Sequence, residues 1–184
     1  SEALVSEQPR VTPPTDEPVI KKTVGGQASK ELTNQDDVFT WEVAASFGND
    51  TSDWTEVKIT DQINDLLDIK DIRIVDENDT DVTSKGTLDT TNNLVTFTLN
   101  QENGSFTYLA GHTYTLYIDS QIKSSATPEE LSPYIKDGGI PNQATLAFGD
   151  GSETLVSEQP RVTPPTEEPV IKKTVGGQAS KELT

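Results

Sequence analysis

The sequence predicts an all-β protein, and within that class an antiparallel β-sandwich. Apolar and polar residues alternate in several short runs, which is the pattern of strands that are buried on one face. Polar turn segments separate these runs, and a succession of short strands of this kind favours a sandwich. The composition agrees, because Thr, Ser, Asn and Val are frequent, aromatic residues make up only 6% of the chain, and Cys is absent.

The alternation is clearest in 38–47, where Phe39, Trp41 and Val43 share one face of the expected strand. Read along the chain, the expected strands are 19–24, 38–47, 54–61, 71–83 (a strand, a turn and a second strand), 94–100, 112–119 and 142–149. One or two short helices are expected between them, at 62–69 and 127–135. The second begins with Thr127 as N-cap and Pro128 at the first helical position.

The two ends of the chain are nearly identical. Residues 152–184 repeat residues 1–33 with two differences, Ala3 against Thr154 and Asp16 against Glu167. The period of 151 residues (152 − 1) is the size of a domain, so the pattern indicates whole domains in tandem. The expected parts are a Pro-rich linker, extended or disordered (1–17), a β-sandwich repeat (18–149), a second Pro-rich linker (150–168) and the first strand of the next repeat (169–184).

Charge and composition exclude several classes of function. Lys and Arg total 14 against 31 Asp and Glu, so the net charge is −17, which makes nucleic acid and anionic membranes poor partners. No apolar run is long enough for membrane insertion. His112 is the only histidine and is expected at a strand end, and the acidic segment 76–86 lacks the Gly and Glu of an EF-hand loop. We therefore expect no metal and no cofactor.

Three polar residues lie in register with apolar faces of their strands: Lys22, Asp61 and Asn142. Burial favours the neutral forms of an amine and a carboxyl, and a neutral amine is a nucleophile. If the three side chains meet, Lys22 can attack the side-chain amide carbon of Asn142 while Asp61 polarises the carbonyl and transfers protons. The product is an isopeptide bond plus ammonia. Lys21 is an alternative nucleophile, although parity favours Lys22, and each residue alone can also be a strand-end group whose tip reaches water.

The segments around these residues resemble a known family. "IKKTV", "VKITDQINDLLDI", "IPNQATLAF" and "LAGHTYTLYI" are similar to motifs of the intramolecular isopeptide-forming domains of Gram-positive surface adhesins and pilins, of the collagen-adhesin A-like and fimbrial type. The resemblance covers about residues 18–149 and implies a DE-variant immunoglobulin-like sandwich. It also implies that Lys22 bonds to Asn142 and that Asp61 is the catalytic acid. The Pro-Gly usual after the Asp motif is replaced here by "QINDLL".

Together these observations favour a structural role. We expect a stalk or spacer repeat of a cell-wall-anchored bacterial surface adhesin, located outside the cell and stabilised by an autocatalytic Lys–Asn bond. Its reaction would be single-turnover self-crosslinking, so the chain is not expected to be an enzyme. The alternative is an adhesive module that binds a host or partner-cell protein. The expected partners are neighbouring repeats, and the expected solution state is a monomer whose tail at 169–184 either stays mobile or docks on another molecule.

Overall fold

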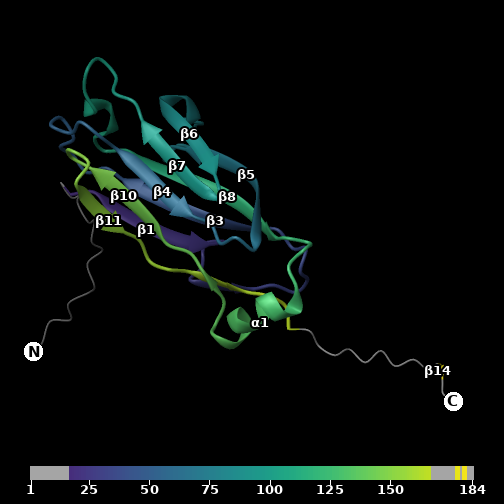
Figure 1. The fold of residues 1–184 in the computed structure, drawn as a ribbon. Helices are drawn as coiled ribbons and strands as arrows, with labels where there is room; N and C mark the ends of the chain where they lie inside the picture. The colour runs from purple at the N-terminus through teal and green to yellow at the C-terminus, as the bar shows by residue number, and fades with distance from the viewer. Residues whose placement is uncertain (1–16, 167–176, 179, 182–184) are drawn as a thin grey trace, which may run out of the picture.

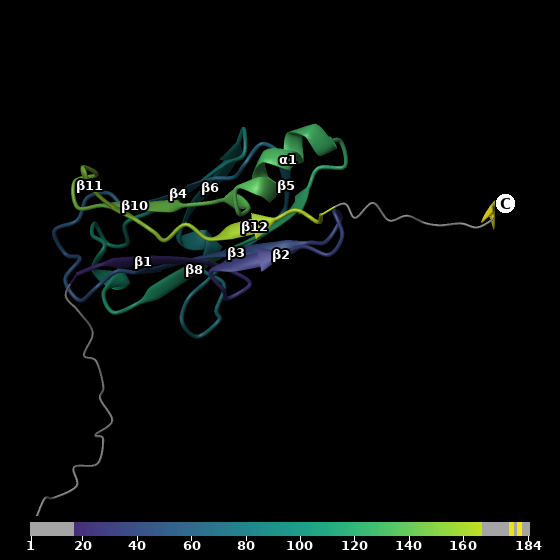
Figure 2. The same cartoon turned by 90° about the horizontal axis from the view of Figure 1, so that it is seen from below.

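The chain folds into two β-sheets that pack face to face (Figure 1). This computed structural model describes residues 17–166, together with the backbone of 177–178 and 180–181. Figure 2 shows the two sheets edge-on as separate layers. The predicted fold class, an antiparallel β-sandwich, is confirmed.

The first sheet has four antiparallel strands in the order β1-β3-β8-β5. Their bounds are Val19–Val24 (β1), Phe39–Ser46 (β3), Thr113–Ile122 (β8) and Leu67–Val75 (β5). Strict alternation puts every second residue of the two central strands into the core. In β3 these residues are at most 2% exposed: Phe39, Trp41, Val43 and Ala45.

The second sheet has five antiparallel strands in the order β11-β10-β4-β7-β6. Their bounds are Glu153–Val156 (β11), Ala144–Phe148 (β10), Lys58–Gln62 (β4), Leu94–Leu99 (β7) and Gly86–Thr91 (β6). Ile59, Phe97 and Leu146 from the three inner strands are fully buried against the first sheet. The core therefore lies between two faces that are each built by period-two alternation.

A third, small sheet connects the two layers along one edge. It consists of β2 (Ser29–Glu31), β12 (Arg161–Thr163) and β9 (Ile140–Pro141), with β12 in the middle. The middle strand runs parallel to β2, which follows β1, and antiparallel to β9, which precedes β10. In Figure 2 the yellow β12 lies between the two layers. Two further short strands, β13 (Gly177–Gln178) and β14 (Ser180–Lys181), pair with each other.

One α-helix, α1 (Pro128–Lys136), lies between β8 and β9, and its start agrees with the predicted N-cap. The Thr127 hydroxyl accepts a hydrogen bond from the Glu130 backbone N–H, and the Glu130 carboxylate accepts one from the Thr127 N–H, which forms a capping box. Single 3₁₀ turns occur at Thr83–Lys85 and Thr107–Leu109. In the part of the chain that the structure describes, no helix has the length and apolarity needed to span a membrane.

The prediction of a helix at 62–69 is wrong. Strand β4 ends at Gln62, a turn follows, and β5 begins at Leu67. The Asn64 side chain accepts a hydrogen bond from the Leu66 N–H at 2.8 Å, and Asn93 donates to the carbonyls of Asn64 and Leu67. These side-chain bonds satisfy the backbone in a turn and so compete with helix formation. Of the strand, turn and second strand expected within 71–83, the second strand is reduced to a single bridge between Asp81 and Val75, and the next strand, β6, pairs with β7.

The segment 150–168 differs from the linker that its prolines suggested. It contains β11 and β12, and Val162 in β12 is fully buried. Neither strand contains a proline, and Pro160 and Pro164 lie just outside β12. Because proline has no backbone N–H, its position outside the strands leaves their sheet hydrogen bonds intact. The sandwich therefore continues past residue 149 to Thr163. Residues 1–16 and most of 169–184 lie outside the described residues, so the expectations for them stay predictions.

Candidate functional site

Strands β1 and β4, from the two sheets, and the short segment between β9 and β10 bring the predicted polar residues into the core. In β1, Lys22 shares the inward face with Ile20 and Val24, and the turn that ends this strand uses Gly25 and Gly26, both with positive φ. Lys22 is only 2% exposed, whereas Lys21 points outward and is exposed. The structure therefore places Lys22, and not its neighbour, inside the sandwich.

Asp61 and Asn142 come from the opposite sheet. Asp61 lies in β4 and is 1% exposed, and its register partner across the ladder is Ala144 of β10. Asn142 precedes this alanine by two residues, which makes it the diagonal neighbour of Asp61 on the same face of the sheet. Asn142 is 3% exposed. All three predicted residues thus face the same interior region between the sheets.

Lys22 and Asp61 are in direct contact across the core. The Lys22 Nζ donates a hydrogen bond to Asp61 Oδ2, and both side chains are completely excluded from solvent. The same Nζ lies 5.2 Å from the centre of the Trp41 ring, which covers it from β3. Apart from the inward parity of Trp41, nothing in the sequence predicts this aromatic contact.

Burial shifts the protonation equilibria of this pair toward the neutral forms. Loss of hydration lowers the pKa of Lys22 below its usual 10.5, although the adjacent Asp61 carboxylate opposes the shift. Loss of hydration likewise raises the pKa of Asp61 above its usual 3.8, against the opposing effects of Lys22 and the nearby Asn142 amide. A neutral amine beside a protonated carboxyl is the pairing that burial favours here.

Several polar atoms of this region have no partner in hydrogen-bonding geometry among the described residues. They are Asp61 Oδ1, both amide atoms of Asn142 and the Trp41 indole nitrogen. Buried polar groups without partners are rare in folded proteins, and each usually has a functional or structural reason. An amine, a carboxyl and a free amide enclosed together are the reactants of an acyl transfer from the amide nitrogen to the amine.

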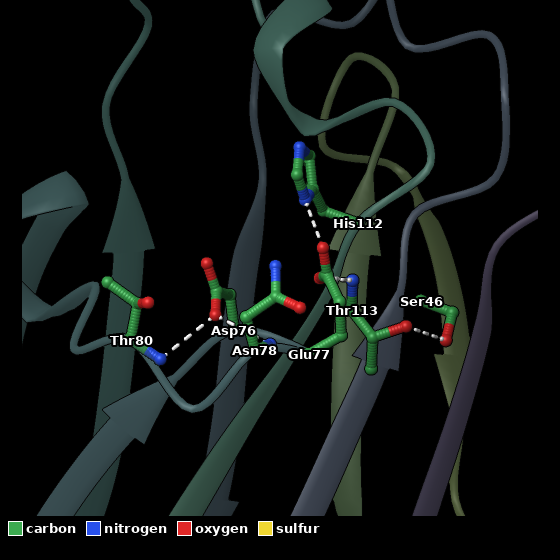
Figure 3. Close-up of polar contacts among 7 residues, drawn as sticks. All are labelled: Ser46, Asp76, Glu77, Asn78, Thr80, His112 and Thr113. Atoms are coloured by element: carbon green, nitrogen blue, oxygen red, sulfur yellow. Dashed lines mark hydrogen bonds and ion pairs between the residues drawn. The ribbon is translucent and has the colours of Figure 1, made fainter.

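The other sequence candidates do not form a comparable site. His112 directly precedes β8, as expected for a strand-end residue, and its Nδ1 lies 2.7 Å from a carboxylate oxygen of Glu77 (Figure 3). Both side chains are exposed. In the acidic loop, the Asp76 carboxylate accepts hydrogen bonds from the backbone N–H groups of Asn78 and Thr80, which closes the turn. Among the described residues no three His, Asp or Glu side chains cluster as metal ligands would.

Comparison with known proteins extends these observations. The chain is 30% identical over 184 residues to platelet adherence protein A of Streptococcus gordonii, an alignment that covers 94% of this chain but 5% of that protein. The chain thus spans only a small part of this relative. No protein-family model matches the chain.

Solved structures share the fold at low sequence identity. The major pilin subunit BcpA of Bacillus cereus superposes with a TM-score of 0.63 at 19% identity, over 80% of this chain and 40% of that chain. The C-terminal fragment of the major pilin GBS80 of Streptococcus agalactiae gives 0.57 at 16%, covering 80% and 56%. The N-terminal domain of the Streptococcus gordonii adhesin Sgo0707 gives 0.59 at 13%, covering 84% and 33%. The chain therefore has the immunoglobulin-like sandwich fold that these pilin and adhesin domains share.

Proposed function

We propose that this chain is a structural repeat of a bacterial cell-surface protein, and that an isopeptide bond between Lys22 and Asn142 locks its sandwich. One observation carries the proposal: a largely apolar core encloses Lys22, Asp61 and Asn142 together, with Lys22 hydrogen-bonded to Asp61. The pilin and adhesin folds reported above, and the similarity to a streptococcal platelet adherence protein, support the surface location.

The chemistry needs no cofactor. The neutral Lys22 Nζ attacks Cγ of Asn142, and the protonated Asp61 carboxyl donates a hydrogen bond to the amide oxygen, which takes up negative charge in the tetrahedral intermediate. Asp61 then relays the proton that the amine loses to the Asn142 nitrogen. The Cγ–Nδ2 bond breaks, ammonia leaves, and a Cγ–Nζ amide bond remains. Each domain reacts once, so the reaction is self-crosslinking and not turnover catalysis.

Enclosure is what makes so weak an electrophile reactive. Fixed geometry replaces a bimolecular encounter, and exclusion of water both keeps the amine neutral and prevents hydrolysis of the amide. The resulting bond would join β1 of one sheet to the residue before β10 of the other. A covalent tie between sheets resists force, heat and proteolysis in a chain without cysteine.

Intact mass tests the proposal directly. The purified chain should weigh one ammonia less than its sequence requires, and peptide mapping should find Lys22 joined to Asn142. Lys22→Ala should have the mass that its own sequence requires, with no loss of ammonia. Lys21→Ala, which changes the exposed neighbour, should lose ammonia as the wild type does. Asp61→Ala should fold but keep its ammonia. A folded wild-type chain with the full sequence mass would refute the bond.

A second function is favoured by the relative named as a platelet adherence protein. On this reading the repeat is itself an adhesive module that binds a protein on host or partner cells. Saturable binding of the purified chain to platelets, with competition by unlabelled chain, would support the module. Binding no greater than that of an unrelated acidic domain would leave the spacer function, because a spacer needs no affinity for a host surface.

A further inference from the structure

The four residues between β11 and β12 contact the backbone of both reacting residues. Glu158 Oε1 accepts a hydrogen bond from the Lys22 N–H at 2.9 Å, and the Pro160 carbonyl accepts one from the Asn142 N–H at 3.1 Å. Lys22 lies in the outer strand of its sheet, so its outward N–H has no strand to pair with. This short segment therefore supplies the hydrogen-bond acceptor for the backbone N–H of the nucleophile Lys22 and for that of the acceptor residue Asn142.

Further bonds hold the same segment against the residues that follow Asn142. The Ser157 N–H donates to the Ala144 carbonyl at 2.9 Å, and the Ser157 hydroxyl accepts from the Ala144 N–H at 2.9 Å. The Gln143 side chain donates to the Ser157 carbonyl at 2.9 Å. Ser157 is itself 5% exposed. After β11 the chain thus continues to pair with the start of β10 and with Asn142, which precedes it.

Strand β12 anchors the far end of this segment. Val162 is fully buried, opposite Ile140 of β9 and Lys30 of β2. Residues 157–163, here named the strap, therefore run along the open edge between the two sheets from β11 to β12, as Figure 2 shows. Behind the strap, the Lys22 side chain is completely buried, although it belongs to an outer strand.

We propose that the strap completes the reactive site: it excludes water from the edge beside β1 and holds Lys22 and Asn142 in register for bond formation. This inference rests on the proposed function, because it concerns the efficiency of that reaction. The strap lies beyond the acceptor residue in the chain, so the site is incomplete until residue 163 has been added. The strap sequence is also the one repeated at 6–12.

The repeated ends provide matched variants for a test in the full chain. Val162→Glu and Glu158→Ala change the strap, while Val11→Glu and Glu7→Ala make the same changes in the copy, in the same local sequence. Glu158→Gln removes the charge but keeps an oxygen that can accept from the Lys22 N–H. Ammonia loss is followed by intact mass at intervals after a pulse of cell-free synthesis, with circular dichroism as a check of folding.

Val162→Glu and Glu158→Ala should slow ammonia loss roughly tenfold or more, because small displacements of reacting groups have effects of this size. Both changes in the copy, and Glu158→Gln, should react at the wild-type rate. Equal rates for strap and copy variants would overturn the inference but leave the proposed function intact. Slowing by Glu158→Gln as great as by Glu158→Ala would also overturn it, since the hydrogen bond would then not matter. A wild-type chain that never loses ammonia would instead refute the proposed function.

Discussion

Replacing the acceptor residue should reveal how much stability the covalent tie contributes. Asn142→Ala removes the electrophile but leaves Lys22 hydrogen-bonded to Asp61. The two amide atoms it deletes have no hydrogen-bond partner among the described residues, so their loss alone should cost little. The stability difference between wild type and this variant therefore measures the bond and not the side chain.

The size of the effect follows from the loop that the bond closes. Lys22 and Asn142 are 120 residues apart (142 − 22). The chain-entropy treatment used for disulfides gives about 5 kcal/mol for a loop of this length. For a domain of this size each kcal/mol corresponds to a change in Tm of about 2–4 °C, so the variant should melt about 10–20 °C below the wild type.

Thermal unfolding by calorimetry, with intact mass measured on each sample, is the assay. Ser120→Ala is the matched control, since Ser120 is also fully buried and its hydroxyl also has no partner among the described residues. The control should stay within a few degrees of the wild type, because removal of an unpaired buried hydroxyl is close to neutral. A melting temperature of Asn142→Ala as close to wild type as the control would refute the reasoning.

Three further predictions concern the pair, the helix and the response to force. In Lys22→Ala, Asp61 stays buried with a raised pKa, so this carboxyl contributes most stability at low pH, and its contribution falls as pH rises from 3.8 through the raised value. The free energy of unfolding in urea, measured across this pH range, should therefore fall more steeply with pH in Lys22→Ala than in Lys22→Ala/Asp61→Ala. The same pH dependence in both variants would contradict the prediction. Thr127→Ala should cost about 1 kcal/mol in urea unfolding by removing the capping box, and no change would mean that α1 contributes nothing to the cooperative unit. Under tension, the locked domain should release little beyond the 24 residues after Asn142 (166 − 142), roughly 80 Å at about 3.4 Å each. Asn142→Ala should release all 150 described residues (166 − 17 + 1), and a full-length release by the wild type would exclude the tie.

The sequence could predict which face each site residue occupies, because a strand has a strict period of two. Ile20 and Val24 identify the inward face of β1, and the same reasoning places Asp61 and Asn142. Parity cannot predict which inward residues meet across the core. That depends on strand order, which brings β1 opposite β4 and β10 and puts the Trp41 ring beside Lys22.

Other features escaped prediction because their causes are tertiary. Strand β6 lies at the sheet edge with four of its six residues exposed, and Leu88 is its one large apolar residue, so its sequence carries too little apolar pattern to identify it. The turn at Asn64 depends on bonds from Asn93, which is distant in sequence. The strap has one fully buried apolar residue, Val162, between prolines, and prolines alone are typical of a linker. The near-identity of 1–15 and 152–166 was the available signal that this segment belongs to the repeating unit.

The position of the strap relative to the bond implies an order of events. In an array under load, force would enter the domain at β1 and pass through the Lys22–Asn142 bond, so the 119 residues between the two (142 − 22 − 1) would be spared. The strap lies after Asn142 and stays in the path of the force, held only by hydrogen bonds and packing. If the strap acts before the bond forms, its later position in the path of the force does not affect the bond. A new amide bond needs no enclosure to persist, so a strap that detaches later under load leaves the lock in place. A noncovalent strap is therefore sufficient for a covalent lock, provided that folding precedes tension.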